Sequence, residues 1–547
     1  MGFFVKILSY LSLLFCCVRA VISPPNTVEL ALTTSFDNQD GNQYYVNFTV
    51  GTPGQLQTVL IDTGSSNTAI VSSNASFCRT LDCAGGTFDS SRSSTFVTTK
   101  PEALRQYYVD GTYLNGDYFT DVVQMSTYKA LKLIFKWQGL AIYEDSLTRS
   151  PDDLQITNFS MGLGNKFNMT FQPYTGTLGL GYSSQMVHVW KKNQPKVTLP
   201  PSFVEALVQA GVISSRLYSI YLNTLDWYGS ILFGGLDTEK YEGPLTTLNF
   251  FPGADGVVDN FYLRLESVKM YPHDGPNQTV VQSAKDRTFI TVLDTGTPGW
   301  ELPTSAYHKV LGYAGVESAD GAYPGSGIDD DGFVRPCADV ARGLDNTTRF
   351  EITFTGYGTN TATLNLELAD LFTPLTSKDG SAMTDRFGRA MCWLRVTEKP
   401  ASNFLTTSSG VMRAGYWIFD MDNGQVSLAQ AKLRANSSNV IQVEAGADGL
   451  RKAVHDLRSD TQKADIEGPK ATSMAYSIST ANSTIGYATG TEAYPTATGT
   501  TRYFGHDSPK PASSALIRRS ESAAAAIGNA CWSVAACFVV VLTLVVL

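Results

Sequence analysis

Two stretches of the chain carry the same tripeptide, and its first residue can do acid–base chemistry. Asp62 stands in Gln57-Thr-Val-Leu-Ile-Asp-Thr-Gly-Ser-Ser, and Asp294 stands in Phe289-Ile-Thr-Val-Leu-Asp-Thr-Gly-Thr-Pro, in the other half of the chain. Each copy is an apolar run typical of a buried strand, followed by Asp-Thr-Gly. One copy would be weak evidence, because a strand that ends in an aspartate turn is common. Two copies indicate that the same structural motif occurs in both halves of the chain.

Two carboxyl groups within hydrogen-bonding distance cannot both ionise cheaply, so such a pair holds one proton and titrates with two separate pKa values. The ionised member can take a proton from a water that attacks a peptide carbonyl, while the protonated member donates to the developing oxyanion. This chemistry requires no metal, no cofactor and no covalent intermediate. We therefore predict that Asp62 and Asp294 are the catalytic pair of a peptide hydrolase.

The residues that follow the two aspartates suit supporting roles. In each copy a threonine can brace the loop from beneath, a glycine lets the backbone pass close to the carboxyls, and a hydroxyl can hold a carboxylate in its plane. These residues are Thr63, Gly64 and Ser65 in the first copy and Thr295, Gly296 and Thr297 in the second.

Strands must position these loops. From Tyr44 to about Ala431, short β-type runs alternate with Gly, Asn, Asp and Pro turns, which predicts an all-β fold. We expect an amino-terminal lobe over residues 44–215, a carboxy-terminal lobe over 216–432, and a cleft between them. One helix is predicted within Pro201–Gly211, with Pro near its start and Gly at its end.

Composition excludes one large class of function. Of the 547 residues, 43% are apolar and 17% are charged, which favours a β-rich globular protein. The formal net charge is −9. A nucleic-acid partner is therefore not expected, because binding to phosphates needs a basic surface.

Both ends of the chain resemble targeting segments. Lys6 precedes an apolar run that ends in Val18-Arg-Ala20, so residues 1–20 are predicted to be a signal peptide. Residues 433–522, rich in Ser, Thr and Ala, are predicted to be a disordered stalk. Residues 523–547 end in an apolar stretch without a basic tail, which favours a glycolipid (GPI) anchor signal that tethers the protein to the membrane. The alternative is a single membrane-spanning helix.

Cysteine usage indicates an oxidising compartment. Four cysteines remain outside the terminal segments, namely Cys78, Cys83, Cys337 and Cys392. Two disulfides are expected, and although three pairings exist, the closeness of the first two favours Cys78–Cys83 and Cys337–Cys392. A zinc site is the competing interpretation, but CxxC spacing and nearby histidines are missing. Eight Asn-x-Ser/Thr sequons agree with a secreted glycoprotein on the outer face of the plasma membrane or in the cell wall.

Several motifs resemble the pepsin-like aspartic peptidase family, in particular its fungal yapsin-like and memapsin-like members. The matching segments are Tyr44-Tyr-Val-Asn-Phe-Thr-Val-Gly-Thr-Pro, Thr175-Gly-Thr-Leu-Gly-Leu-Gly-Tyr, Gly229-Ser-Ile-Leu-Phe-Gly-Gly-Leu-Asp and Tyr416-Trp-Ile-Phe-Asp-Met-Asp-Asn. The resemblance implies a bilobal acid-protease fold and a monomeric aspartic endopeptidase that cleaves extended polypeptides at acidic pH. Residues 21–43 are then a short pro-like segment, in which Val28-Glu-Leu-Ala-Leu can instead add a strand.

The family closes a hairpin flap over its substrate. In Gln106-Tyr-Tyr-Val-Asp-Gly-Thr-Tyr, the Asp-Gly turn signal and the resemblance select Tyr108 as the flap tyrosine, with Gly111 at the tip. The alternative is an ordinary surface hairpin. Ala69 stands where pepsin-like enzymes have a tryptophan, and memapsin-like members instead use an aromatic on the flap, here Tyr113.

Two further departures concern the carboxy-terminal half. Pro298 replaces the hydroxyl residue that holds the substrate backbone in the family, so one substrate contact is expected to be lost. No hydrophobic-hydrophobic-Gly loop precedes Tyr416, where only Phe404-Leu-Thr-Thr-Ser-Ser-Gly is found. These departures motivate an alternative function, a catalytically inactive pepsin-fold binding protein. A serine hydrolase or a metallohydrolase is disfavoured, because neither Gly-x-Ser-x-Gly nor His-Glu-x-x-His occurs.

Overall fold

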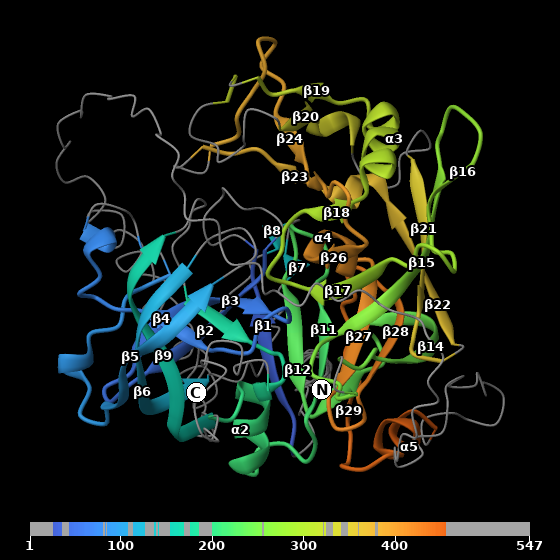
Figure 1. Cartoon of the computed structure of the whole chain (residues 1–547). Coiled ribbons are helices and arrows are strands. Elements are labelled where there is room, and N and C mark those ends of the chain that lie inside the picture. Colours follow the sequence, from blue (N-terminus) through green and yellow to red (C-terminus); the bar gives the residue numbers. More distant parts are fainter. Residues whose placement is uncertain are drawn as a thin grey trace, which may run out of the picture. The chain divides into compact units, whose positions relative to one another are not determined.

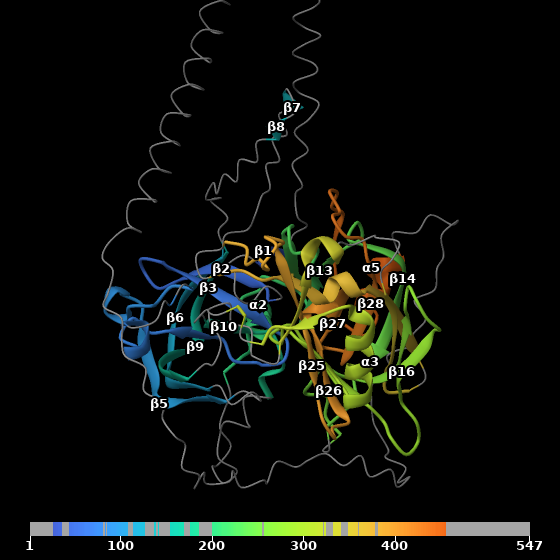
Figure 2. The same ribbon diagram turned by 90° about the horizontal axis from the view of Figure 1, so that it is seen from above.

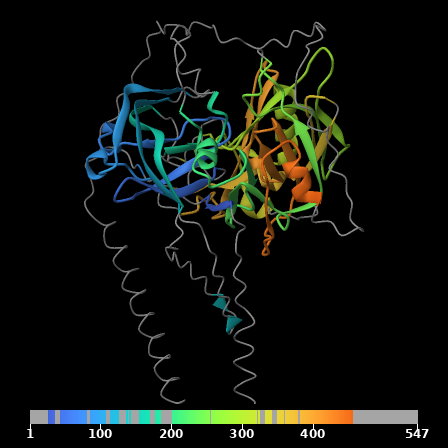
Figure 3. The ribbon, with the colours of Figure 1, turned by 90° about the horizontal axis from the view of Figure 1, so that it is seen from below.

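The computed structural model describes residues 26–34, 43–79, 83, 85–107, 113–125, 136–137, 140–141, 154–168, 176–184, 200–253, 256–320, 322–323, 332–340, 348–358, 360–377 and 381–455. All of them belong to one compact unit, Met1–Thr480. Figure 1 shows its two lobes side by side, with the blue and cyan strands in one and the yellow and orange strands in the other, and Figures 2 and 3 agree from above and below.

The amino-terminal lobe is built on a seven-stranded sheet. Its strands alternate buried and exposed residues, as Val46, Phe48 and Val50 point into the core while Asn47 between them is exposed. In spatial order the strands are β2 (Tyr45–Val50), β3 (Gln55–Asp62), β10 (Gly176–Gly179), β4 (Ala69–Val71), β9 (Leu154–Asn168), β6 (Tyr113–Met125) and β5 (Val97–Tyr107).

The carboxy-terminal lobe repeats this plan with a six-stranded sheet. Five strands follow one path and the sixth, β16, pairs with β15 beside it. The strands are β22 (Thr361–Glu367), β21 (Arg349–Thr355), β15 (Tyr262–Tyr271), β17 (Ile290–Asp294), β26 (Phe404–Ser408) and β16 (Gln278–Gln282).

A second six-stranded sheet joins strands from both ends of the chain. Strand β1 pairs antiparallel with β12, which places Leu30 and Leu32 in the core, so Val28–Leu32 does add a strand. In order, the strands are β1 (Val28–Leu32), β12 (Gly229–Phe233), β11 (Leu217–Tyr221), β27 (Gly415–Asp420), β28 (Gln425–Ala431) and β14 (Tyr241–Asn249).

The strand that carries each aspartate rests on a parallel neighbour. In the first lobe β10 runs parallel to β3 and Gly179 pairs with Asp62, while in the second β26 runs parallel to β17 and Ser408 pairs with Asp294. Phe404–Gly410 therefore takes the place of the hydrophobic-Gly loop that appeared to be missing. The sequence does not predict this loop, because buried Thr407 and Ser408 occupy the positions at which the motif has an apolar residue and a glycine.

The remaining elements are short. Three two-stranded sheets pair β18 (Trp300–Leu302) with β25 (Val396–Glu398), β13 (Gly235–Asp237) with β29 (Val440–Gln442), and β7 (Lys136–Trp137) with β8 (Leu140–Ala141). A four-stranded sheet contains, in spatial order, β19 (Glu317–Ser318), β20 (Phe333–Pro336), β24 (Met391–Leu394) and β23 (Phe372–Pro374). The short 3₁₀ helices are η1 (Ser76–Arg79), η2 (Ser90–Arg92), η4 (Cys337–Asp339) and η5 (Leu368–Leu371). The disulfides are Cys78–Cys83 and Cys337–Cys392, as predicted.

The predicted helix is α2 (Phe203–Gln209). Ser202 caps it by accepting from Glu205 N, and the Glu205 side chain accepts from Ser202 N, which completes a capping box. Helices α3 (Thr304–Ala314), α4 (Ser409–Met412) and α5 (Gly449–His455) were not expected. Helix α3 lacks a side-chain cap at Pro303, so its start carries little local signal.

The folded unit continues beyond the predicted boundary at residue 432. Strand β29 pairs with β13, and Val443, Leu450 and Val454 are buried in a cluster with Leu236. The stalk predicted from residue 433 thus begins too early, because residues 433–455 bury apolar side chains against the sheet between the lobes.

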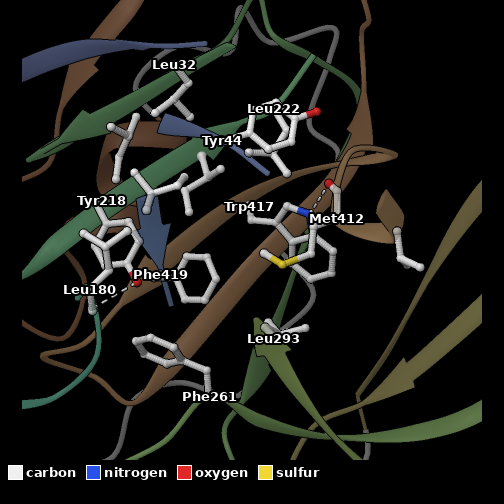
Figure 4. Packing of buried hydrophobic residues seen from close by; sticks show 14 of the residues in the cluster. Leu32, Tyr44, Leu180, Tyr218, Leu222, Phe261, Leu293, Met412, Trp417 and Phe419 are labelled. Carbon is white, nitrogen blue, oxygen red and sulfur yellow. Dashed lines mark hydrogen bonds between the residues drawn. The ribbon is translucent and has the colours of Figure 1, made fainter. Parts of the chain in front are cut away.

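The main core runs through both lobes. Figure 4 shows part of it, with Tyr218, Trp417 and Phe419 among aliphatic side chains. Two of its aromatic side chains bond to the backbone: Trp417 Nε1 donates to Met412 O (2.7 Å) and the Tyr218 hydroxyl donates to Leu180 O (3.2 Å).

Candidate active site

Each aspartate is the last residue of its strand, β3 for Asp62 and β17 for Asp294. Leu180 N donates to Asp62 O (2.8 Å), and Gly181 N donates to Ser65 O (2.9 Å), so the first loop rests on the chain after β10. In the second lobe Ser409 N donates to Thr297 O (3.2 Å) in the same way. The two loops are therefore fixed from the core rather than from the surface.

Each carboxyl receives one backbone and one hydroxyl donor from its own loop. Asp62 accepts from Gly64 N (2.9 Å) and from Ser65 Oγ (2.5 Å). Asp294 accepts from Gly296 N (2.8 Å) and Thr297 Oγ1 (2.7 Å). The two sets match residue for residue, and they fix the plane of each carboxyl.

The carboxyls meet between the loops. The side chains of Asp62 and Asp294 are hydrogen-bonded to each other. A Cβ on Gly64 would lie 2.7 Å from Asp294 Oδ1, and a Cβ on Gly296 would lie 2.7 Å from Asp62 Oδ1. Each glycine of the repeated tripeptide is thus required by the carboxyl of the opposite loop.

Two threonines brace the loops beneath the carboxyls. Thr63 Oγ1 donates to Leu293 O (2.7 Å) and accepts from Thr295 N (3.0 Å). Thr295 Oγ1 donates to Ile61 O (2.8 Å) and accepts from Thr63 N (3.1 Å). Both threonines are fully buried, so these four bonds tie the aspartate-bearing strands together without competition from water.

Burial and the close pairing of the carboxyls dominate the electrostatics. Burial is the main reason that the pKa of Asp62 is raised well above its ordinary value of 3.8. The negative charge of Asp294 and the bond between the carboxyls raise this pKa further, whereas the Ser65 hydroxyl and Gly64 N–H lower it. The pair therefore keeps a proton at pH values at which an isolated aspartate has lost it.

Part of the predicted flap can be placed. Tyr108 and Gly111 lie outside the described residues, whereas Tyr113 begins β6 opposite Tyr107. A different tyrosine links β6 to the chain that follows Asp62, because the Tyr118 hydroxyl donates to Asn67 Oδ1 (3.2 Å). Sequence reasoning missed Tyr118, whose only signal is its inward position on an alternating strand.

Leucine packs over the alanine that replaces the family's tryptophan. Ala69, Leu104, Leu114 and Tyr118 form a small buried cluster. A Cβ on Gly162 would lie 2.7 Å from Leu104 Cδ2 and 3.1 Å from Ala69 Cβ, so the small residues make room for Leu104. The lobe is therefore well packed without an aromatic at position 69.

Comparison with known proteins decides the family. A family model described as eukaryotic aspartyl protease matches residues 43–138 and 138–431. The chain belongs to the eukaryotic aspartyl protease family. The match spans both lobes and both aspartate loops of this aspartyl protease.

Individual relatives of the protease include fungal enzymes. It is 27% identical to the probable aspartic-type endopeptidase opsB of Aspergillus oryzae over 447 residues, which are 80% of this chain and 79% of that protein. It is 26% identical to the aspartic proteinase yapsin-3 of Saccharomyces cerevisiae over 73% of this chain and 68% of that protein. Pepsin II-2/3 of Oryctolagus cuniculus is 29% identical over 54% of this chain and 63% of that protein.

These comparisons confirm the predicted pepsin-like fold and the resemblance to yapsin-type enzymes. They also confirm that the protein is an aspartic endopeptidase, a hydrolase acting on polypeptides. The roles of individual residues, including the loss of a substrate contact at Pro298, stay predictions.

Proposed function

We propose that Asp62 and Asp294 share one proton and together activate a water that hydrolyses peptide bonds of extended polypeptides. The observation that supports this most directly is the hydrogen bond between the two carboxyls, each held by donors from an equivalent loop. Since a single chain supplies both carboxyls, the enzyme needs no partner subunit to complete the pair and acts as a monomer.

The reaction follows from the shared proton. The ionised carboxyl of the pair removes a proton from the water, whose oxygen attacks the peptide carbonyl carbon. The protonated carboxyl donates to the carbonyl oxygen as negative charge develops there. The proton gained from water then passes to the leaving nitrogen as the C–N bond breaks. Ser65 and Thr297 keep each carboxyl in one plane throughout.

Substrate binding is assigned to the groove between the lobes. Tyr108, Gly111 and Tyr113 are proposed to form a flap on β5 and β6 that closes over an extended peptide and excludes water. Tyr118 supports this flap through Asn67, five positions after Asp62.

The test is the loss of peptidase activity in Asp62→Asn and Asp294→Asn. Each change keeps the size of the side chain but removes acid–base function, so cleavage of denatured protein at acidic pH should fall by at least about 1000-fold. Asp286→Asn, at an exposed aspartate of the second lobe, is the matched control and should cleave like the unchanged enzyme. Activity that survives in either catalytic variant, or that resists pepstatin, refutes the proposal.

We further propose that the enzyme enters the secretory pathway and works at the outer face of the plasma membrane or in the cell wall, held by a glycolipid anchor. Two disulfides support an oxidising compartment. The sequon residues Asn47, Asn74, Asn158, Asn277 and Asn436 are all exposed, as glycan attachment requires. Among the residues that the structure describes, no helix has the length and apolar character needed to cross a membrane.

A further inference from the structure

A side chain directly before the amino-terminal lobe reaches the second catalytic loop. Gln43 Nε2 donates to Gly296 O at 2.7 Å. Gly296 is the residue whose N–H donates to Asp294 Oδ1 (2.8 Å) and on which an added Cβ would lie 2.7 Å from Asp62 Oδ1. The Gln43 amide thus binds one of the two glycines that lie next to both catalytic carboxyls.

The backbone at Gln43 is fixed to the strand of the other aspartate. Ile61 N donates to the carbonyl of Tyr44 (3.0 Å), and the following residue, Tyr45, pairs with Leu60 on β3. Gln43 therefore stands directly before a stretch that is paired with the strand ending at Asp62. Its amide spans from this strand pair to the Asp294 loop.

Neighbouring tyrosines hold Gln43 in place. The Tyr45 hydroxyl donates to Gln43 Oε1 (3.2 Å), so the amide has one orientation, with its NH₂ group toward Gly296 O. Tyr44 is fully buried in the core that joins the lobes (Figure 4). Its hydroxyl donates to Asn223 O (3.4 Å) and is hydrogen-bonded to Arg413, so both contacts lie outside the first sheet.

We infer that Gln43 is a positioning residue that aligns the two catalytic carboxyls by holding the Gly296 carbonyl. Its amide acts on the peptide between Gly296 and Thr297, and these two residues supply both donors to Asp294. Thr63 and Thr295 brace the loops from below, whereas Gln43 fixes the second loop from the side of the amino-terminal segment. The alignment of the two carboxyls thus depends on the position of Gln43, where the segment of residues 21–43 joins the first lobe.

This inference rests on the proposed catalytic pair and predicts a specific kinetic signature. Gln43→Met keeps the length of the side chain but removes the donor, so the Gly296 carbonyl loses one hydrogen bond. We expect kcat to fall about 10-fold, the equivalent of one hydrogen bond, with KM nearly unchanged. Because the carboxyls then interact less strongly, the two pKa values of the pH–rate profile should move closer together. The bell-shaped profile of rate against pH should therefore become narrower.

A double-mutant cycle tests the route through Tyr45. Tyr45→Phe removes the hydroxyl that orients the amide, so kcat should fall about threefold in the unchanged enzyme and not at all in Gln43→Met. Gln278→Met is the matched control. Gln278 lies on β16 in the second lobe, and its Nε2 donates to the hydroxyl of Tyr313 on α3 (2.9 Å). This control should keep the activity and the pH profile of the parent.

The outcomes separate the inference from the proposed function. The inference fails if Gln43→Met keeps the parent kcat and bell width, if only KM changes, or if the effects of Gln43→Met and Tyr45→Phe add. Thermal unfolding of each variant shows whether the fold is kept, and a loss of kcat that simply follows a loss of folded protein also overturns it. If the unchanged enzyme does not cleave, or does not need Asp62 and Asp294, the proposed function itself is wrong.

Discussion

At the scale of the residue, the site is a balance of opposing influences on one carboxyl. Burial and the nearby Asp294 favour the neutral form of Asp62, while the Ser65 hydroxyl and Gly64 N–H favour the ionised form. Catalysis needs both forms within the pair, because one carboxyl must accept a proton while the other donates one. We therefore expect the Ser65 hydroxyl to influence the pH range of the enzyme as well as the plane of the Asp62 carboxyl.

Ser65→Ala should move the pH–rate bell to higher pH. The Ser65 hydroxyl stabilises the ionised form, so its removal raises the pKa of the pair. The alkaline limb of the pH–rate profile, at which the shared proton is lost, therefore moves to higher pH. A hydrogen bond to a charged group is worth about 1.5–3 kcal/mol, so a shift of about one pH unit is expected for this half-buried donor. The measurement is kcat/KM against pH.

Ser66→Ala is the control for this shift. The Ser66 hydroxyl donates to the backbone carbonyl of Tyr182 (2.6 Å), so its removal should leave the pH–rate profile in place. A shift of the Ser65→Ala bell to lower pH, or none, would show that the hydroxyl does not tune the pair.

At the scale of the element, the strands beside the two aspartates, β10 and β26, carry different residue types at equivalent positions. Gly179 beside Asp62 cannot carry a side chain, since a Cβ would lie 2.4 Å from the Ser66 carbonyl carbon. Ser408 takes the equivalent place beside Asp294, and Thr407 bonds Thr291 through their hydroxyls (2.8 Å). The strand pairing is kept while the residue pattern changes, so the sequence pattern does not reveal the second supporting strand.

Elements after residue 432 should contribute measurably to stability. Leu450 on α5 is 7% exposed and packs in the cluster that contains Val443 and Leu236. Leu450→Ala should lower the free energy of unfolding by about 2–3 kcal/mol, as measured by denaturant unfolding of the full chain. The neighbouring Arg451→Ala removes only an exposed ion pair with Asp448 and should cost less than about 1 kcal/mol. Equal stability of the two variants would mean that α5 is not part of the cooperative unit.

At the scale of the whole molecule, the ends of the peptidase unit meet in one sheet. The sheet between the lobes contains β1 from the amino-terminal segment and the β27–β28 hairpin from near the end of the family match. Strand β1 buries Leu30 and Leu32 there, so removal of residues 26–34 would uncover the core. A pro-segment, if cleaved, is thus expected to end before Val28.

The proposed anchor gives a prediction about the intact chain on cells. Phosphatidylinositol-specific phospholipase should release the enzyme into the medium with its peptidase activity intact, because the lipid is attached beyond the folded unit. A chain that lacks residues 523–547 should be secreted without treatment. Retention on cells after the phospholipase would favour a membrane-spanning helix instead.

The sequence by itself determined the chemistry and the class of fold. Two apolar runs into Asp-Thr-Gly, alternating strands and four cysteines were sufficient, because these signals are local and repeated. Tertiary structure decided the contacts that join distant segments: Gln43 with Gly296, Tyr118 with Asn67, and residues 433–455 with β13. Such contacts leave little mark on sequence, since a hydrogen-bonding or apolar side chain has a partner only after the chain has brought the two together.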